Sequence, residues 1–345
     1  MPVVNTRVLH GPPTGVQRYV SEILAAWPDS PPERITPPVA LSRGLAGHAW
    51  EQFVLPARLR RSQLLWSPVH SGPLAWRNQV VTVHDVVPLD HPEWLNRRFA
   101  RWYRFMLPRL VRRARHVIAI SEFTRRRLIA TCGLPVDRTS VIPCGVGEDF
   151  RPASAQAIEA ARARLGLGRG RYLLALGSLE PRKNIPALLE AWQRARAQLP
   201  DDLVLVVAGA AGDPAVFGDA GLGAWPDGVL ATGHIEDRDL PALYSGAEWS
   251  LCVSRYEGFG LTPLESMACG TPVIVSDIPV FNESVGEAGL RVDPHSPEAI
   301  AEGLRQALSG GGLRRELAAR ATERSARFCW RRSARATRDL LTRFA

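Results

Sequence analysis

The sequence predicts an α/β protein made of two doubly wound, Rossmann-like domains. Short apolar runs alternate with helical patterns along all 345 residues, and this alternation is typical of parallel sheets covered by helices on both faces. The length fits two domains, and a hydrophobic content of 46% fits globular cores. Polar clusters follow the strands, which is where ligands bind in such folds.

The second half of the chain shows the alternation most clearly. Its expected strands are Tyr172–Ser178, Leu203–Gly209, Val229–Gly233, Trp249–Ser254, Pro272–Asp277 and Gly289–Asp293. Its expected helices are Asn184–Leu199, Asp239–Ala247, Thr262–Cys269 and Ser296–Ser309. The apolar runs are continuous rather than alternating, which indicates strands buried on both faces.

The first half repeats the theme less regularly. Its expected strands are Val3–Leu9, Leu64–Ser67, Gln79–Asp85, His116–Ser121 and Thr139–Cys144. Its expected helices are Gly15–Trp27, Arg97–Ala114 and Glu122–Cys132. The Pro-rich residues 27–38 indicate a loop or an edge strand, and residues 145–155 lack periodicity. We therefore expect one domain over residues 1–148 and a second over residues 149–329.

The composition favours a protein of the reducing cytosol over a secreted or membrane-spanning protein. Five scattered cysteines form no CxxC pair, which argues against a disulfide framework or a zinc site. The first residues lack the pattern of a signal peptide, and no apolar run approaches the roughly 18 residues of a membrane span. We therefore expect a cytoplasmic protein.

The net charge of +9 lies entirely in the first half. Residues 1–150 hold 20 Arg and 11 Asp plus Glu, whereas residues 151–345 hold 23 basic and 23 acidic residues. Such an excess of positive charge can attract an anionic membrane, a phosphorylated substrate or nucleic acid. The alternative is an arginine-rich surface that is simply solvated. No nucleic-acid-binding motif accompanies the charge, so we expect no nucleic-acid partner.

The helix expected near residues 96–116 gathers much of this charge. It interleaves arginines with aromatic and aliphatic residues, namely Phe99, Trp102, Tyr103, Phe105 and Leu107. Basic and aromatic residues at helical spacing suit an anionic membrane surface. The alternative is a core helix with a solvated basic face, and the pattern alone does not separate the two.

The first chemical cluster is GSLEPRKN, at residues 177–184. It follows a strand and precedes a helix, and its adjacent cations Arg182 and Lys183 suit a diphosphate. A solvated turn is the plain alternative. However, 42 of the 43 basic residues are arginine, and Lys183 is the only lysine. This usage indicates that a compact ammonium is needed at this position.

The second cluster is YEGFGLTPLE, at residues 256–265. Thr262 is the expected N-cap of the following helix, and Pro263 fits its first position. Free amides at such a helix start favour an anion. Glu265 fits a capping box with Thr262 as well as a functional role, whereas Glu257 lies in the glycine-rich loop and is expected to be functional.

Two further loops follow strands of the first half. His84 and Asp85 end an apolar strand, which makes His84 a better candidate for function than an isolated histidine. The loop GPPTG after the first strand resembles a phosphate loop only loosely, because its two prolines lack amide donors. It does not match the dinucleotide-binding fingerprint GxGxxG.

Together these motifs resemble family 4 of the glycosyltransferases, a retaining group with the GT-B fold. Glu257 to Glu265 matches the family's E-x7-E motif, within EGFGLTPLESMACGTPVI. GSLEPRKN, VHDVVP, AISEFTRRRL, VIPCGV and TGVQRY match its other blocks in order. TGVQRY and HDVVPLDHPEW look most like bacterial polysaccharide mannosyl- or rhamnosyltransferases. The resemblance implies two Rossmann-like domains that face each other across a cleft.

The resemblance also implies roles in donor binding. Arg182 and Lys183 would neutralise the donor diphosphate, Glu265 would bind the ribose, and Glu257 would bind a hydroxyl of the donor sugar. Ile235 would meet the base through its backbone. The amides that wrap the sugar and the distal phosphate would be those of Gly258, Phe259, Gly260, Leu261 and Thr262.

The first domain would supply the remaining contacts. His84 would contact the donor sugar near its anomeric carbon, and Gly15 and Val16 would lie under the sugar and the acceptor, with Asp85 on the acceptor side. The helix at residues 330–345 would pack back on the first domain. The Pro-Pro loop departs from the family's Gly-rich run, which leaves the contacts of that loop open.

The implied activity is transfer of a hexose from a nucleotide-sugar to a saccharide or a polyprenyl-linked saccharide, with GDP-mannose as the expected donor. No DxD motif is present, so no metal or other cofactor is expected. A UDP- or dTDP-sugar such as a rhamnose donor is the first alternative. A GT-B nucleotide-sugar epimerase is the second, and a non-catalytic binding subunit is the third. A lipid-linked acceptor would place the enzyme on the inner face of the plasma membrane.

Overall fold

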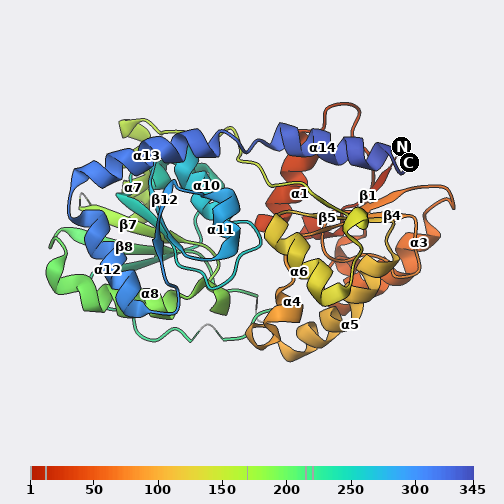
Figure 1. Ribbon diagram of the computed structural model, residues 1–345, viewed down its shortest axis with the longest axis horizontal. Coiled ribbons are helices and arrows are strands. Elements are labelled where there is room, and N and C mark those ends of the chain that lie inside the picture. Colours follow the sequence, from red (N-terminus) through yellow and green to blue (C-terminus); the bar gives the residue numbers. More distant parts are fainter. Residues whose placement is uncertain (1, 12–13, 169, 214–215, 220) are drawn as a thin grey trace. The chain divides into compact units, whose positions relative to one another are not determined.

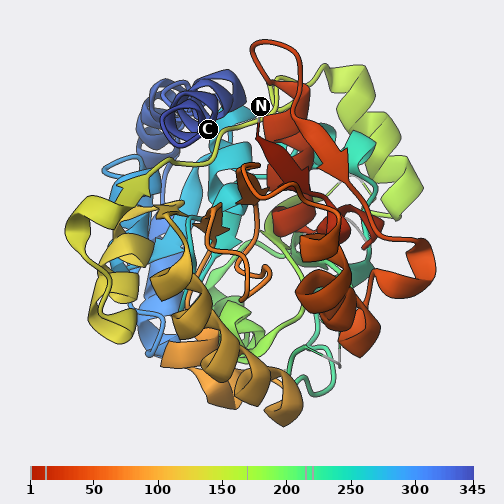
Figure 2. The ribbon, with the colours of Figure 1, turned by 90° about the vertical axis from the view of Figure 1, so that its right-hand side faces the viewer.

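Two compact units make up the chain in the computed structural model, which describes residues 2–11, 14–168, 170–213, 216–219 and 221–345. Unit 1 comprises residues 1–145 and 329–345, and unit 2 comprises residues 146–328. Each unit holds one six-stranded sheet with helices around it (Figures 1 and 2). The α/β class with two doubly wound sheets, expected from the sequence, is confirmed.

The sheet of unit 1 is parallel throughout, with the strand order β2-β1-β3-β4-β5-β6. The strands are β1 (Val3–Asn5), β2 (Glu33–Ile35), β3 (Leu65–Ser67), β4 (Gln79–Val83), β5 (His116–Ala119) and β6 (Thr139–Val141). The chain places β2 on one side of β1 and all later strands on the other side. The topological switch point of this unit therefore lies between β1 and β3.

Helices complete unit 1. They are α1 (Gly15–Ala25), α2 (Gly44–Ala49), α3 (Leu55–Ala57), α4 (Val87–Asp90), α5 (Arg97–Arg113), α6 (Glu122–Cys132) and α14 (Trp330–Thr342). Between α2 and α3, residues Trp50–Val54 form a π-helix. Helix α14 packs against α1, although more than 300 residues separate them in sequence. Gly145 makes this return possible, because a Cβ atom there would lie 2.2 Å from the backbone nitrogen of Trp330.

The sheet of unit 2 is also parallel, with the order β12-β11-β10-β7-β8-β9. The strands are β7 (Arg171–Leu176), β8 (Leu203–Ala208), β9 (Val229–Gly233), β10 (Trp249–Cys252), β11 (Val273–Ser276) and β12 (Gly289–Val292). Strands β8 and β9 extend the sheet on one side of β7, and β10 to β12 extend it on the other. The switch point of this unit lies between β7 and β10.

Both faces of this second sheet are covered by helices. These are α7 (Ala155–Leu165), α8 (Ile185–Ala195), α9 (Leu240–Ser245), α10 (Leu261–Ala268), α11 (Pro279–Ser284), α12 (Pro297–Leu308) and α13 (Gly311–Ser325). The side chains of successive residues in β7 point to opposite faces of the sheet, as in any β-strand. Leu173 joins a core with α8 and α12, whereas Tyr172 and Leu174 join a core with α9. Across the described residues, no helix is both long and apolar enough to cross a membrane.

Several sequence-based elements differ from the structure. The strand expected over Val3–Leu9 ends at Asn5, because the Asn5 side chain accepts a hydrogen bond from the Arg7 amide (3.1 Å) and the chain turns into a 3-10 helix over Arg7–His10. The Pro-rich stretch 27–38 does contain an edge strand, β2. Helices α2, α3, α4, α7, α11 and α13 were not predicted.

Candidate functional site

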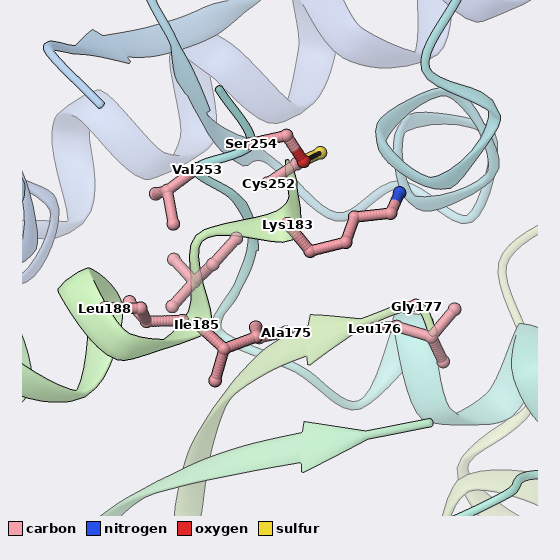
Figure 3. A pocket seen from close by; sticks show the side chains of 10 residues that line it. Ala175, Leu176, Gly177, Lys183, Ile185, Leu188, Cys252, Val253 and Ser254 are labelled. Carbon is pink, nitrogen blue, oxygen red and sulfur yellow. Dashed lines mark hydrogen bonds between the residues drawn. The ribbon is translucent and has the colours of Figure 1, made fainter. Parts of the chain in front are cut away.

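Polar side chains gather at the switch point of unit 2, where β7 and β10 lie side by side. The carboxyl ends of these two strands lead into residues 177–184 and 253–260, respectively. A small pocket opens here, and Lys183, Ser254 and Gly177 are among the residues that line it (Figure 3). A ligand is expected at such a switch point from the topology alone.

The turn that carries the cations is fixed by its own sequence. Residues Pro181–Lys183 form a 3-10 helix, and Asn184 adopts a left-handed backbone with φ 61°. Asn184 is buried, and its side-chain amide donates to the carbonyls of Val253 (3.1 Å) and Pro294 (2.7 Å). The turn is therefore tied to the loops that follow β10 and β12.

Arg182 and Lys183 converge on one carboxylate. The Lys183 Nζ lies 2.7 Å from Glu257 Oε1, and the Arg182 guanidinium lies 2.7 Å from Glu257 Oε2. The Arg182 Nε also donates to Glu180 Oε2 at 2.8 Å. Ser254 donates to Glu257 Oε1 at 2.8 Å. The sequence placed the cations and Glu257 in one site, and the structure brings them into direct contact.

Glu257 is an ionised carboxylate in a largely buried position. Its side chain is 8% exposed and that of Lys183 is 13% exposed. Burial alone raises the pKa of a carboxyl group, but the charges of Lys183 and Arg182 outweigh burial and lower the pKa of Glu257 to about 2. Because the folded-state pKa lies below the usual value of 4.5, this ion pair stabilises the fold above that pH and loses its effect as the pH falls towards 2.

Helix α10 begins earlier than the sequence indicates. Its N-cap is Gly260, with φ 92°, and its first residue is Leu261. The prediction that Thr262 is the N-cap is therefore wrong, and so is the capping box with Glu265. A Cβ atom on Gly260 would lie 2.6 Å from the Phe281 ring, so only glycine fits this start. The part-exposed residues Leu261 and Thr262 carry amides that the helix itself cannot satisfy.

The other donor-side candidates lie around this helix start. Glu265 is buried within α10 and accepts a hydrogen bond from the Tyr244 hydroxyl at 3.2 Å. Gly258 and Phe259 belong to the buried loop before the helix, and the Phe259 ring packs edge-on against Phe328. Ile235 follows β9 and is buried in the core that includes α9. Glu265 is therefore a polar group with its own partner rather than part of a cap.

The first-domain candidates all lie in unit 1, at the carboxyl ends of β1 and β4. His84 is buried against Tyr19, and its Nε2 lies 2.9 Å from the Pro68 carbonyl. Burial, followed by the influence of His70, lowers the pKa of His84 to about 4, so its ring is neutral at pH 7. The Asp85 carboxylate accepts a hydrogen bond at 3.1 Å from the amide of Val87, the first residue of α4.

Gly15 and Val16 are the first two residues of α1, and neither is buried. The amides of these two residues have no hydrogen-bond partner within α1 itself, because they belong to its first turn. Pro12 and Pro13, which the sequence analysis singled out in the preceding loop, lie outside the described residues.

The basic helix predicted near residues 96–116 is α5, and most of its apolar residues belong to the core. Tyr103 and Leu107 are buried, while Phe99 and Trp102 pack against the same core. Phe105 is 47% exposed, and the Arg109 guanidinium stacks on its ring at 3.9 Å. The expected interfacial row of aromatic residues is therefore wrong except at Phe105, because the apolar stripe of the helix faces the core. The arginines themselves are exposed, namely Arg97, Arg98, Arg101, Arg104, Arg109, Arg112, Arg113 and Arg115.

Three site residues had no assigned role in the sequence analysis. Ser254 and Glu180 hold Glu257 and Arg182 in place, and Asn184 anchors the turn. An asparagine directly before a Pro-containing helix start, as in KNIP, is a detectable signal for a left-handed turn residue. No local sequence pattern indicates a role for Ser254, because its role is known only from its hydrogen bond to Glu257 in the folded structure. Among the described residues, no group of three or more His, Cys, Asp or Glu side chains is arranged to hold a metal.

Comparison with known proteins places the chain in a family. Residues 157–324 match the family model described as glycosyl transferases group 1, and residues 13–150 match that of glycosyltransferase family 4. Solved structures share the fold along the whole chain. HepE of Anabaena, solved with UDP and glucose, has a TM-score of 0.76 at 20% identity, covering 99% of both chains. WaaG, a glycosyltransferase of lipopolysaccharide biosynthesis, has a TM-score of 0.72 at 18% identity, covering 99% of this chain and all of the other.

Curated relatives are more similar in sequence. The O-antigen chain mannosyltransferase B of Escherichia coli is 30% identical over 280 residues, which cover 81% of this chain and 69% of that protein. The serotype-specific mannosyltransferase WbdA of E. coli is 32% identical over 283 residues, covering 80% of this chain. The match spans only about a third of WbdA, 34%. The family models, these identities and the two parallel sheets together show that the chain belongs to the family 4 glycosyltransferases, the glycosyl transferases group 1, which have the GT-B fold.

Proposed function

We propose that this glycosyltransferase retains the configuration of the transferred sugar, and that its donor is GDP-mannose. The acceptor would be a saccharide or a polyprenyl-linked saccharide of a bacterial surface polysaccharide. The observation that carries the proposal is the convergence of Lys183 and Arg182 on Glu257 beside the first amides of α10. Cations and helix amides are what a leaving diphosphate requires. The mannosyltransferase relatives support the choice of sugar.

Each part of the donor would then meet a separate group. The diphosphate would lie against Lys183, Arg182 and the amides of Leu261 and Thr262. Glu257, whose two oxygens already orient both cations, would accept a hydrogen bond from a hydroxyl of the sugar. Glu265 would bind the ribose, and the backbone of Ile235 would meet the base. Because Glu257 and the two cations are adjacent, the sugar and the diphosphate would be bound as one unit.

Retention would follow if the acceptor hydroxyl attacks the donor sugar on the same face from which the diphosphate departs. The carboxylate next to His84 in sequence is Asp85, which already accepts a hydrogen bond from the Val87 amide at 3.1 Å, and the ring of His84 is neutral at pH 7. The acceptor hydroxyl would therefore attack as the bond to the diphosphate breaks, and its proton would pass to the departing phosphate oxygen. The cations would stabilise the negative charge that develops on that oxygen.

The proposed donor can be tested with a panel of nucleotide-sugars. Purified enzyme is incubated with GDP-mannose, UDP-glucose, UDP-galactose and dTDP-rhamnose, each with a set of methyl glycosides, and the nucleoside diphosphate and glycoside products are measured. Transfer from GDP-mannose with retained anomeric configuration supports the proposal. A preference for a UDP- or dTDP-sugar would show that this nucleotide-sugar, and not GDP-mannose, is the donor. Isomerised nucleotide-sugar without transfer would indicate an epimerase, and binding without turnover would indicate a binding subunit.

Catalysis is expected to need no metal ion. We expect turnover in excess EDTA to stay within about twofold of the untreated rate, because Lys183, Arg182 and helix amides supply the positive charge that a bound metal otherwise provides. The measurement is the initial rate of nucleoside diphosphate release before and after chelation. Loss of that rate on chelation, with recovery on addition of Mg²⁺ or Mn²⁺, would contradict the prediction.

Unit 1 is expected to bind anionic membranes through the exposed arginines of α5. With Phe105 as the one clearly exposed aromatic residue of this helix, the attraction would be mainly electrostatic and therefore sensitive to salt. We expect sedimentation with vesicles containing anionic phospholipid, and a loss of about tenfold in binding for the double variant Arg101→Glu/Arg104→Glu.

The matched control reverses two exposed arginines of α13 in unit 2, Arg315 and Arg320. These variants have the same change in net charge, so a general charge effect would weaken binding equally in both. Equal binding of the wild-type enzyme to neutral and anionic vesicles would reject membrane attachment altogether.

A further inference from the structure

Exposed apolar side chains are concentrated in one short segment of unit 1. Among the described residues, eight large hydrophobic side chains are exposed, and five of these lie within residues 39–54. Leu45 is 89% exposed and Phe53 is 78% exposed, so both side chains project into solvent. Such a concentration on a folded surface marks a contact with a partner or a membrane. We call Val39, Leu41, Leu45, Phe53 and Val54 the outer stripe.

Most of the outer stripe lies on one face of a helical segment whose other face is in the core. Helix α2, the π-helix and helix α3 follow one another without a break. Trp50 and Leu55 belong to the core of the unit. The exposed face repeats every four residues, at Leu45, Ala49, Phe53 and Ala57. A helix at a water-exposed surface normally has polar residues on its outer face, so this segment departs from the usual pattern.

The π-helix adds Val54 to the exposed face. In an α-helix, the residue stacked above Trp50 would be Val54, four positions later. Here the Leu55 amide donates to the Trp50 carbonyl, so Leu55 takes the inward place and packs in the same core as Trp50. The extra residue in this turn therefore leaves both Phe53 and Val54 exposed.

The exposed charges of this segment are all positive. Four exposed arginines flank the helical segment, namely Arg43, Arg58, Arg60 and Arg61. The one carboxylate within residues 39–61 is Glu51, which is fully buried and pairs with Arg7 at 3.4 Å. An apolar surface with arginines at its rim and no exposed carboxylate complements an anionic membrane, where apolar side chains meet acyl chains and guanidinium groups meet phosphates.

The outer stripe adjoins α5, the basic helix of the same unit. The centre of the His48 ring on α2 lies 5.3 Å from that of Trp102 and 5.9 Å from that of Tyr103, both on α5. The Trp102 ring in turn stacks on Phe105, the exposed aromatic residue of α5, at 6.2 Å. The stripe and the exposed arginines of α5 therefore belong to neighbouring helices.

We propose that the outer stripe inserts into the interfacial layer of an anionic membrane, with Arg58, Arg60 and Arg61 at the lipid phosphates. Side chains that project from the surface need a matching pocket in a protein partner, whereas a fluid acyl layer accommodates them without one. The inference rests on the membrane attachment proposed for α5 and adds a hydrophobic contact made by a different segment. It does not depend on the identity of the donor or the acceptor.

The first test compares the wild-type enzyme with Leu45→Gln/Phe53→Gln in sedimentation with vesicles of phosphatidylethanolamine and phosphatidylglycerol. We expect the double variant to bind about 10- to 100-fold more weakly. Thermal unfolding should be unchanged, because both side chains are exposed. Salt does not screen the burial of apolar groups, so this ratio should persist at raised ionic strength, whereas the loss in Arg101→Glu/Arg104→Glu should shrink.

The matched control is Val136→Gln. Val136 is an exposed aliphatic residue of the same unit, but it lies in the 3-10 helix Val136–Arg138 before β6, at the edge of the sheet opposite to β2. Its replacement should leave vesicle binding within about twofold, whereas Leu45→Gln alone should weaken binding by about threefold to tenfold. An equal loss in both single variants would assign the effect to general surface hydrophobicity and overturn the proposal.

A fluorophore at position 53 reports insertion directly. It is attached to Phe53→Cys in a chain that also carries Cys329→Ser, because the other four cysteines are buried. On addition of the anionic vesicles, its emission should shift to shorter wavelength and should be quenched by brominated acyl chains. The same label on Val136→Cys should show neither change.

Three outcomes would overturn the insertion. Unchanged vesicle binding of Leu45→Gln/Phe53→Gln, or a label on Phe53→Cys that stays in water while the protein binds vesicles, would leave only the attachment through α5. Self-association that the double variant abolishes, without a change in vesicle binding, would make a second copy of the chain the occupant of the stripe. None of these measurements uses a nucleotide-sugar, so their failure is distinct from failure of the proposed transferase function.

Discussion

Replacing Lys183 with arginine is expected to lower kcat/KM by about 30- to 1000-fold, which corresponds to about 2–4 kcal/mol of transition-state stabilisation. Arginine carries the same positive charge as lysine, so the fall in kcat/KM would come from the different shape of its side chain. The Lys183 Nζ lies 2.7 Å from Glu257 Oε1, and its stem passes close to Gly177, where an added Cβ would lie 3.4 Å from Lys183 Cε. A guanidinium is longer, planar and directed by its fork, and cannot occupy this single-point position.

The size of this effect follows from the proposed role of the ammonium. A cation that meets the departing diphosphate acts where negative charge develops, and loss of one such donor has effects of this magnitude. Lys183→Ala should be similar or worse. Both variants should remain folded, because Glu257 keeps its contacts with Arg182 and Ser254.

A matched control exchanges a cation at the other end of β7, the strand that leads into the turn of Lys183. Arg171 is the first residue of β7, at the amino end of the sheet, and pairs with Glu248 at 3.3 Å. Arg171→Lys should leave the kinetic constants within about twofold, as expected for a partly exposed ion pair. If Lys183→Arg retained the turnover and donor affinity of the wild-type enzyme, Lys183 would be only a structural charge and its diphosphate role would be wrong.

Glu257→Gln is expected to lower kcat about 100-fold while donor affinity changes by less than about threefold. Glu257 neutralises Lys183 and Arg182 and is proposed to hold the donor sugar, where positive charge develops in an oxocarbenium-like transition state. The amide retains the shape of the side chain but removes the charge. Without this charge, the two cations would be available to the diphosphate, so binding of the donor is retained while turnover falls.

Glu265→Ala should produce the opposite pattern. Its proposed partner, the ribose, does not react, so the loss should appear in donor affinity, by about tenfold to 100-fold, with little change in kcat. The measurements are donor titration and single-turnover rates. Equal losses of affinity for both variants, with unchanged turnover, would contradict the two assignments.

Glu248→Gln is the matched control for Glu257→Gln. Glu248 is a partly buried carboxylate that also pairs with two arginines, Arg171 (3.3 Å) and Arg314 (3.2 Å), but it precedes β10 whereas Glu257 follows it. Its replacement should change neither turnover nor donor affinity. A comparable loss of kcat in this variant would show that any disturbed ion pair of unit 2 impairs the enzyme.

Local sequence patterns were sufficient to predict most of unit 2 and its candidate site. Continuous apolar runs mark the inner strands β7, β8, β10 and β11 because these strands are buried on both faces. The glycine loop and the helix start after β10 located Glu257 and Glu265. The cap itself was misplaced at Thr262, because a threonine before proline is the usual signal, whereas Gly260 begins the helix with a left-handed backbone.

Other features depend on contacts between distant residues and could not be predicted. The Arg182–Glu257 pair joins positions 75 residues apart in sequence, and the role of Ser254 depends on the same contact. The segment 44–57 combines two short helices with a π-helix and has no steady apolar period, so no element was predicted there. Glu51 was missed for this reason, since a carboxylate without a recognised motif has no local signal.

The return of α14 to unit 1 has a consequence for synthesis of the chain on the ribosome. Unit 2 is one continuous segment of the chain. Unit 1 is complete only after residues 329–345 have been synthesised, because Trp330 packs against Tyr19 of α1. At usual elongation rates, translation of the intervening segment takes about 10–40 s. During this interval nascent unit 1 exposes apolar surface around Tyr19, which makes it the part of the chain that a ribosome-associated chaperone would shield.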